Sequence, residues 1–268
     1  MGDLITMDDL TNEEILQVLD SARRLVPVAK GEVYLPLLQG KVLGNLFFEN
    51  STRTRMSFEA AMKRLGGEVL NLSSVGSSVA KGETLYDTMQ MVDGYADIAV
   101  IRHPNQGAAQ YSADAVEIPI LNGGDGAGNH PTQTMLDLFT IREAHGSLEG
   151  LNVVMVGDLR YGRTTHSLSH ALVRFGAKIT LVSPDALKMP DEIVSDLKNH
   201  GGEITETEEM SSSIDSADVI YMTRIQKERF PDEDEYMKVA GIYKLTEDDL
   251  SEAKSGMIVM HPLPRVNE

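Results

Sequence analysis

The sequence predicts an α/β protein built from two doubly wound parallel-sheet domains. Short apolar runs alternate with segments of helical periodicity along most of the chain, which is the pattern of βαβ units. Many of these apolar runs are continuous, as in parallel strands that are buried on both faces. A length of 268 residues corresponds to about two domains. The series restarts after Gly146, so we predict domains at 1–146 and 147–268.

The first half begins with a helix and continues as strand–helix units. Residues Thr11 to Glu14 read TNEE, a capping box, and Ile15 and Leu25 belong to the helical apolar spacing that follows. The predicted strands are 41–48, 68–73, 96–103 and 116–122. The predicted helices are 55–67, 83–95 and 132–146. We expect the last of these helices to link the two halves.

The second half repeats the same alternation. Its predicted strands are 151–158, 177–184, 217–223 and 256–262, and its predicted helices are 163–176 and 191–201. Each half therefore contains enough apolar strands for a parallel sheet of its own.

Composition excludes several classes of protein. The chain has no cysteine, so disulfides and thiolate zinc sites are excluded, and a reducing cytoplasm fits. Apolar runs are far shorter than the ~20 residues of a membrane span, and the N-terminus lacks a secretory pattern, so we expect no membrane partner. A formal net charge of -17 argues against nucleic acid as a partner, because such binding requires clustered Lys and Arg.

Polar and cationic residues are concentrated where the predicted strands end. The segments that follow the strands read ENSTRTR, SSVGSSVAKGET, RHP, NGGDGAGNHPTQ, GDLRYGRT, TRIQ and HPLPR. In open α/β sheets, ligands bind beyond the carboxyl ends of the strands. The sequence therefore predicts a ligand site formed by these segments.

Residues Ser51 to Thr54 lie where a strand gives way to a helix. The N-terminus of a helix offers backbone N–H groups and a positive dipole end, which together bind anions such as phosphate. Arg53 adds a planar guanidinium that matches phosphate oxygens. The alternative is an ordinary Ser/Thr cap followed by solvated arginines. The placement of Lys81, Arg102 and His130 at the same predicted sheet edge favours the anion site.

Other reaction chemistries find little support. The glycines of GGDGAGNH do not have the spacing of a dinucleotide site, and there is no Walker A motif, nucleophile elbow or cysteine nucleophile. His166 and His170 have the i, i+4 spacing of zinc ligands, but no adjacent Glu and no evident third ligand accompany them. We therefore predict neither a metal nor a cofactor.

The strand-end motifs resemble those of one family. FFENSTRTRMSFE, KGETLYDT, IRHP, GDGAGNHPTQTMLDLFTI, MVGDLRYGRTTHSL, YMTRIQKERF and HPLPR are similar, in this order, to the catalytic chains of aspartate carbamoyltransferases. The pair STRTR and HPTQ is typical of carbamoyltransferases in general. KGET, TRIQKER and HPLPR favour the aspartate enzymes over the ornithine enzymes, which typically carry a Cys in place of Pro262.

The resemblance implies a carbamoyltransferase fold with the site in the cleft between its two domains. It also implies transfer of the carbamoyl group of carbamoyl phosphate to the amine of L-aspartate, giving N-carbamoyl-L-aspartate and phosphate in de novo pyrimidine (UMP) biosynthesis. Direct attack without a covalent intermediate or a metal is expected.

The resemblance also implies residue roles. The implied catalytic residues are Arg53, Thr54, Arg102, His130 and Lys81. The implied carbamoyl phosphate contacts are Ser51, Thr52, Arg53, Thr54, Ser77, Arg102, His130, Gln133, Pro262 and Leu263. The implied L-aspartate contacts are Lys81, Arg163, Thr164, Arg224 and Gln226.

The resemblance implies a cytoplasmic homotrimer with shared active sites, in which Ser77 and Lys81 reach into the site of a neighbouring subunit. Trimers of this family occur alone, with a regulatory chain or with a dihydroorotase, and the sequence leaves this choice open. Family chains typically continue beyond the position of Glu268 with a C-terminal helix, which is absent from the sequence. Two alternatives therefore stay open: a carbamoyltransferase with another amino-acid acceptor, and an inactive carbamoyl-phosphate-binding fragment.

Overall fold

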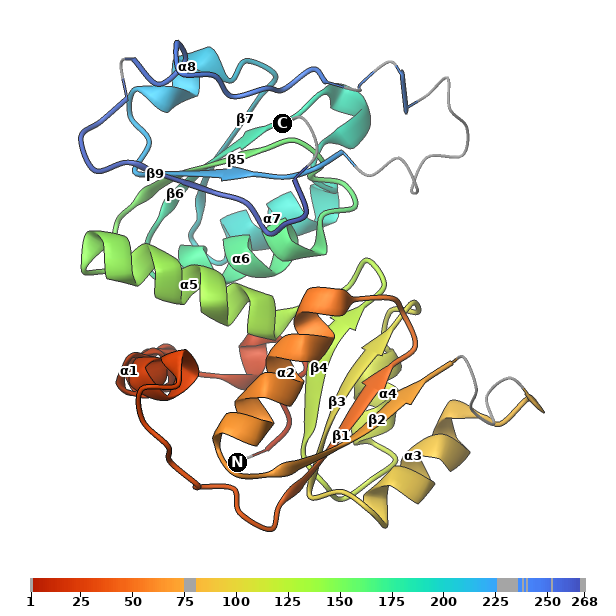
Figure 1. Ribbon diagram of the computed structural model, residues 1–268. Helices are drawn as coiled ribbons and strands as arrows, with labels where there is room; N and C mark the ends of the chain where they lie inside the picture. The colour runs from red at the N-terminus through yellow and green to blue at the C-terminus, as the bar shows by residue number, and fades with distance from the viewer. Residues whose placement is uncertain are drawn as a thin grey trace. The chain divides into compact units, whose positions relative to one another are not determined.

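The computed structural model describes residues 2–74, 81–225, 236–237, 239, 241–251 and 253–265. The chain divides into two compact units, Met1–Met135 and Leu136–Glu268, and each unit contains a parallel sheet flanked by helices (Figure 1). The predicted α/β class with two parallel-sheet domains is thus confirmed. The division falls within helix α5 (Pro131–His145), and the domain boundary after residue 146 stays a prediction.

The sheet of the first unit has the strand order β2-β1-β3-β4. Its strands are β1 (Val42–Phe47), β2 (Glu68–Ser73), β3 (Ile98–His103) and β4 (Ile120–Asp125). Its helical segments are η1 (Met7–Asp9), α1 (Asn12–Lys30), α2 (Thr52–Arg64), α3 (Leu85–Asp93) and α4 (Ala108–Ala113). Neighbouring residues of β1 face opposite sides: Asn45 donates to the carbonyl of Arg55 in α2, and Gly44 lies against Val92 of α3. Helices therefore cover both faces of this sheet (Figure 1).

The sheet of the second unit has the strand order β7-β6-β5-β8-β9. Its strands are β5 (Asn152–Val156), β6 (Lys178–Val182), β7 (Glu203–Thr207), β8 (Val219–Met222) and β9 (Ile258–Met260). Its other helical segments are α6 (Arg163–Val173), η3 (Asp185–Leu187), α7 (Asp191–Asn199) and α8 (Ser211–Ile214). One face of the sheet packs on α8 through Ile214, and α6 and α7 lie on the other face (Figure 1).

The predicted start of α1 is confirmed. The hydroxyl of Thr11 accepts from the backbone N–H of Glu14, and the Glu14 carboxylate accepts from the N–H of Thr11 at 2.8 Å. Two backbone donors that the first turn leaves without helical partners are satisfied in this way. The helix ends at Lys30 and is capped by Gly31, whose φ of 77° lies in the left-handed region that glycine adopts without strain.

Several elements differ from the expectations, among them α8, a helix of four residues that the sequence analysis did not predict. Strand β7 was missed because it is an edge strand whose exposed Glu203, Thr205 and Glu206 hide the apolar pattern. Helix α4 was missed because it has only six residues. Strand β4 begins later than the predicted 116–122 and continues to Asp125, because Asp125 still pairs with His103 after a register shift at the two glycines.

The central strands are apolar because both faces of each sheet are covered. Val100 of β3, Met155 of β5 and Tyr221 of β8 are almost completely inaccessible to solvent. Within the described ranges, no helix has both the length and the apolar character needed to cross a membrane.

Candidate active site

The predicted site residues of the first unit follow three neighbouring strands. Ser51–Thr54 follow β1, Arg102 lies at the end of β3, and His130 follows β4. Because β3 pairs with both β1 and β4, the three carboxyl ends share one edge of the sheet. The register places Phe47 opposite Arg102, and the N–H of Phe48 donates to the Arg102 carbonyl at 2.8 Å. The sheet thus brings the three segments together.

The N-terminus of α2 has the geometry of an anion site. Ser51 precedes the helix in an extended conformation (φ -157°, ψ 111°), and its side chain makes no capping hydrogen bond. The hydroxyls of Thr11 and Thr84, in contrast, cap their own helices. The first-turn residues Thr52 and Arg53 are exposed. Backbone donors, hydroxyls and a guanidinium are thus placed at the positive end of a helix, where an anion is stabilised.

Arg102 is held by the protein before any ligand binds. Its side chain is largely buried; Nη2 donates to Glu49 Oε1 at 2.7 Å and Nη1 donates to the Gly123 carbonyl at 3.2 Å. Two hydrogen bonds on different nitrogens fix the plane of the guanidinium. Little side-chain entropy is then lost when the guanidinium binds an anion.

His130 lies at the N-terminus of α5. Its carbonyl accepts from the N–H groups of Gln133 and Thr134 at 3.0 and 3.2 Å, and Pro131 occupies the first helical position, where no N–H is needed. Thr132 Oγ1 lies 3.3 Å from Nδ1 of the buried ring and orients it. The helix start therefore fixes both His130 and Gln133 at the strand edge.

His103 follows Arg102 but adds little positive charge. Burial lowers the pKa of its imidazole because the charged form is poorly solvated, and this effect outweighs the nearby Glu49. Nδ1 accepts from the N–H of Asn105 at 3.0 Å, and the ring meets Phe48 edge-on at a centroid distance of 5.5 Å. At neutral pH, we therefore attribute the cationic character of this strand edge to its arginines.

The predicted site residues of the second unit also follow neighbouring strands. Arg163 and Thr164 begin α6 after β5, Arg224 follows β8, and Pro262 and Leu263 follow β9. The order β5-β8-β9 places these three carboxyl ends side by side. The side chains of Arg163, Thr164 and Arg224 are partly exposed, so they can reach a ligand.

The ends of β5 and β8 are tied together beside Arg224. The N–H and the hydroxyl of Thr223 both donate to the Val156 carbonyl, at 2.8 and 2.9 Å. Gly157 has a φ of 117°, and a Cβ there would lie 2.5 Å from the Thr223 carbonyl oxygen. Only glycine permits this close approach without strain. The tie fixes the backbone from which Arg224 projects.

The chain bends at Leu263, shortly after β9. The N–H of Leu263 donates to Nδ1 of His261 at 2.8 Å, and Leu263 has a φ of 60°. A positive φ is uncommon for leucine and is found where the surrounding structure enforces it, often at functional sites. This bend therefore has an enforced backbone conformation.

Behind Thr164 lies a buried hydrogen-bond network. Tyr221 is completely buried on β8, its hydroxyl donates to Asp137 Oδ2 at 2.8 Å, and the Thr164 side chain hydrogen-bonds to the same hydroxyl. Burial, followed by the charge of Asp137, raises the pKa of Tyr221 well above its ordinary value. The hydroxyl therefore stays protonated and links α5, β8 and α6.

Two of the predicted site residues, Ser77 and Gln226, lie outside the described residues. Lys81 is described and exposed, shortly before α3. His166 Nε2 lies 2.7 Å from the Leu159 carbonyl, and His170 Nδ1 lies 3.5 Å from Asp196, so the two imidazoles have different partners. In the described part of the chain, no group of three or more potential metal ligands is found.

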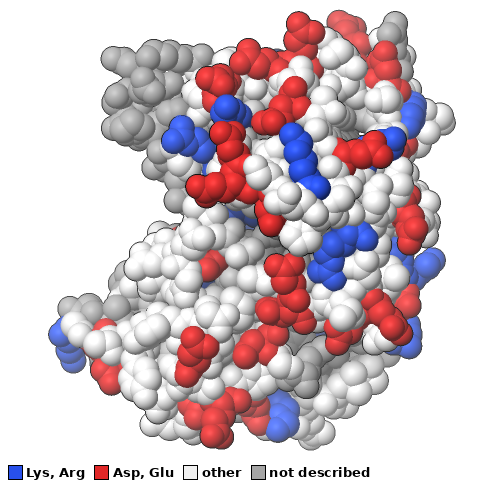
Figure 2. Space-filling model, turned by 180° about the vertical axis from the view of Figure 1, so that it is seen from behind, with Lys and Arg blue, Asp and Glu red and all other residues white. Residues whose placement is uncertain are grey.

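Two carboxylates of the first unit were not among the predicted site residues. Glu49 pairs with Arg102, and Asp125 is buried at the end of β4, where the loop that leads to His130 begins. Both stand inside quoted strand-end motifs, but nothing in a linear motif shows which donors an acidic side chain faces. Elsewhere, on the described part of the face in Figure 2, Lys and Arg are scattered among acidic residues and form no continuous basic patch.

The comparisons agree with the resemblance in the sequence. The carbamoyl-phosphate-binding domain model of aspartate/ornithine carbamoyltransferases matches residues 2–143, and the Asp/Orn-binding domain model matches residues 149–268. The chain is 54% identical to an aspartate carbamoyltransferase catalytic subunit of Archaeoglobus fulgidus, over 100% of this chain and 89% of that protein. It is 55% identical to the corresponding subunit of Methanococcoides burtonii, over 99% of this chain and 86% of that protein.

Solved structures show the same likeness. The catalytic subunit of M. jannaschii aspartate transcarbamoylase superposes with a TM-score of 0.90 at 49% identity, covering 100% of this chain and 87% of that chain. A Trypanosoma cruzi aspartate transcarbamoylase in complex with carbamoyl phosphate and aspartate gives a TM-score of 0.94 at 40% identity, covering 99% and 86%. The chain therefore belongs to the aspartate/ornithine carbamoyltransferase family.

Proposed function

We propose that the chain is the catalytic chain of an aspartate carbamoyltransferase. It transfers the carbamoyl group of carbamoyl phosphate to the amine of L-aspartate, which yields N-carbamoyl-L-aspartate and phosphate for pyrimidine synthesis. The observation that carries this proposal is the uncapped N-terminus of α2 beside the pre-positioned Arg102, at the sheet edge where the family places its phosphate.

In this proposal the first unit binds carbamoyl phosphate. Ser51–Thr54 and Arg102 hold the phosphate group. Thr54, Arg102 and His130 donate to the carbonyl oxygen, on which negative charge grows as the amine attacks. Each donor placed where that charge develops contributes ~3 kcal/mol. Gln133 addresses the carbamoyl NH2 group together with the carbonyls of Pro262 and Leu263.

The second unit holds L-aspartate. Arg163, Arg224, Gln226 and Thr164 bind its two carboxylates, so that its amine faces the carbamoyl carbon. Orienting two substrates can lower the barrier by roughly 7–11 kcal/mol. Direct attack is then sufficient: the amine forms the new C–N bond, the C–O bond to phosphate breaks, and the departing phosphate takes up the proton that the amine loses.

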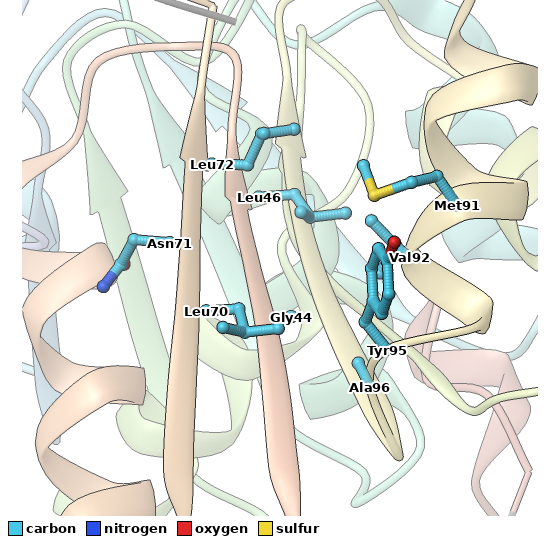
Figure 3. A pocket seen from close by; sticks show the side chains of 9 residues that line it. All are labelled: Gly44, Leu46, Leu70, Asn71, Leu72, Met91, Val92, Tyr95 and Ala96. Atoms are coloured by element: carbon cyan, nitrogen blue, oxygen red, sulfur yellow. The ribbon is translucent and has the colours of Figure 1, made fainter.

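We further propose a cytoplasmic homotrimer with shared active sites. The support is an apolar hollow of about 120 Å³ between β2 and α3, lined by half-exposed Leu70, Met91 and Tyr95 (Figure 3). The segment that carries Ser77 and Lys81 joins β2 to α3. A second copy of the chain that covers the hollow would therefore also receive the residues that the resemblance assigns to a neighbour's site.

The deciding experiment measures product formation from carbamoyl phosphate with L-aspartate and L-ornithine as parallel acceptors. Carbamoyl-aspartate formed with aspartate alone is the expected result. Product formed with ornithine instead would identify the chain as a carbamoyltransferase with another amino-acid acceptor. Carbamoyl phosphate binding by calorimetry without any product would identify a non-catalytic binding protein.

A further inference from the structure

Asp125 is a buried carboxylate at the end of β4, only 3% exposed. Its Oδ1 accepts from the N–H of Asn129 at 2.7 Å and from Asn122 Nδ2 at 3.1 Å. Its Oδ2 accepts from the N–H of Gly107 at 2.9 Å. The carboxylate therefore joins the loop after β4 to the loop after β3.

Further contacts join the ends of β3 and β4. The N–H of Gly126 donates to the His103 carbonyl at 2.9 Å, and Arg102 Nη1 donates to the Gly123 carbonyl at 3.2 Å. The loop after β4 carries His130, and Arg102 lies at the end of β3, just before the loop that contains Gly107. The position of His130 relative to Arg102 therefore depends on these contacts, and the Asp125 carboxylate is the side chain that reaches from the end of β4 to the loop after β3.

We propose that Asp125 is a positioning residue for the transfer reaction: its carboxylate clamps the loop that carries His130 to the loop that follows Arg102 and the end of β3. This inference rests on the proposed function. The clamp holds Arg102 and His130 where negative charge develops on the carbonyl oxygen. Donors stabilise that charge less when they are displaced.

The chemistry of the clamp requires a carboxylate. Asn122 has a fixed orientation, because its Oδ1 accepts from the N–H of Gly124 at 2.8 Å and its Nδ2 donates to the Ile5 carbonyl at 2.9 Å. Every hydrogen-bond partner described above for Asp125 is therefore a donor. An asparagine at position 125 has the same shape, but its NH2 group would face a donor in either orientation. Asp125→Asn thus removes the hydrogen bonds that one of the two carboxylate oxygens accepts, without a change of side-chain volume.

The test compares Asp125→Asn with Asp93→Asn. Asp93 is a matched control because its Oδ1 accepts from the N–H groups of Glu117 and Ile118, both at 3.1 Å, away from the strand-end loops. We expect Asp125→Asn to remain folded by circular dichroism, with kcat lowered roughly ten- to a hundredfold and weaker carbamoyl phosphate binding in calorimetry. Asp93→Asn should lower the melting temperature and leave kcat and carbamoyl phosphate affinity as in the wild type.

A double-mutant cycle with His130→Ala separates positioning from general stability. If Asp125 acts through His130, Asp125→Asn should lower kcat much less in the His130→Ala background than alone. An equal loss in both backgrounds, or wild-type kcat and affinity in Asp125→Asn, would overturn the inference. If the wild type forms no product, the proposed function fails, and the binding comparison decides the inference: unchanged carbamoyl phosphate affinity in Asp125→Asn would then overturn it.

Discussion

Two arginines at the edge of the first sheet differ in how firmly the protein holds their side chains. Arg102 is largely buried and fixed by hydrogen bonds to Glu49 and the Gly123 carbonyl. Arg53 is exposed at the first turn of α2. A fixed guanidinium defines the place of the anion, while an exposed one can close over it at the cost of side-chain entropy.

Arg53→Ala is expected to remove nearly all turnover and to leave the fold unchanged. The side chain is exposed, so its loss creates no cavity, but it removes the charge-assisted contact that we propose Arg53 makes to the phosphate. Steady-state product formation and thermal unfolding measure the two effects. Arg55→Ala, an exposed arginine of the same turn, is the control and should keep most of the activity. Substantial turnover in Arg53→Ala would rule out the role proposed for Arg53.

At the scale of elements, buried polar contacts decide how the strand ends are arranged. In the second unit, the Tyr221 hydroxyl connects β8 to α5 through Asp137 and to α6 through Thr164. Asp137 is itself almost fully buried, so loss of a donor to its carboxylate is expensive. Such a network fixes α6, at whose start Arg163 and Thr164 lie.

Tyr221 should also make the stability of the chain depend on alkaline pH. Its pKa is raised in the folded state by burial and by Asp137, whereas the unfolded chain has a tyrosine pKa of about 10. The stabilisation is therefore complete below pH ~10 and is lost as the pH rises further, because only the unfolded state ionises readily.

Tyr221→Phe is expected to lower the free energy of unfolding at neutral pH by about 1–3 kcal/mol, because the Asp137 carboxylate loses a donor. It should also flatten the alkaline fall in stability. Denaturant unfolding between pH 7 and 11 measures both effects, with Tyr86→Phe, at an exposed tyrosine, as the control. The same alkaline slope in Tyr221→Phe as in the wild type would contradict this account.

At the scale of the whole molecule, the apolar surface beside β2 is the most informative feature. β2 is an edge strand of its sheet, so its outer backbone groups have no neighbouring strand in the described chain. Leu70 is 50% exposed and Tyr95 is 66% exposed, and both line the hollow between β2 and α3. Contiguous exposed apolar side chains of this kind mark association surfaces.

A charge placed in this hollow should prevent trimer formation. We expect Leu70→Asp or Tyr95→Asp to convert a trimer to a monomer in size-exclusion chromatography with light scattering, because an unpaired carboxylate cannot be buried without a large desolvation cost. If the proposed shared site is correct, turnover should fall in parallel, since Ser77 and Lys81 would no longer reach a neighbouring subunit. Tyr111→Asp, at an exposed tyrosine of α4, is the control and should stay trimeric. A wild type that is monomeric at assay concentration would refute the shared site.

Local sequence predicted most of the elements and the residue types of the site. The capping box at Thr11, the apolar strands and the STRT and HPTQ motifs all act through neighbours in the chain, so they can be recognised in the sequence. The same reasoning failed for β7, because the residues of an edge strand that face solvent carry no apolar signal.

The sequence by itself determined the α/β class, the two parallel-sheet domains and the strand-end motifs of the carbamoyltransferase family. Only the tertiary structure decided which side chains fix those motifs in place. Glu49 and Arg102 are 53 positions apart in the chain, and Asp137 and Tyr221 are 84 apart. Asp125 likewise meets Gly107 only because β3 and β4 pair. Such contacts depend on strand order and register, which arise from the packing of the whole sheet and leave no local pattern in the sequence.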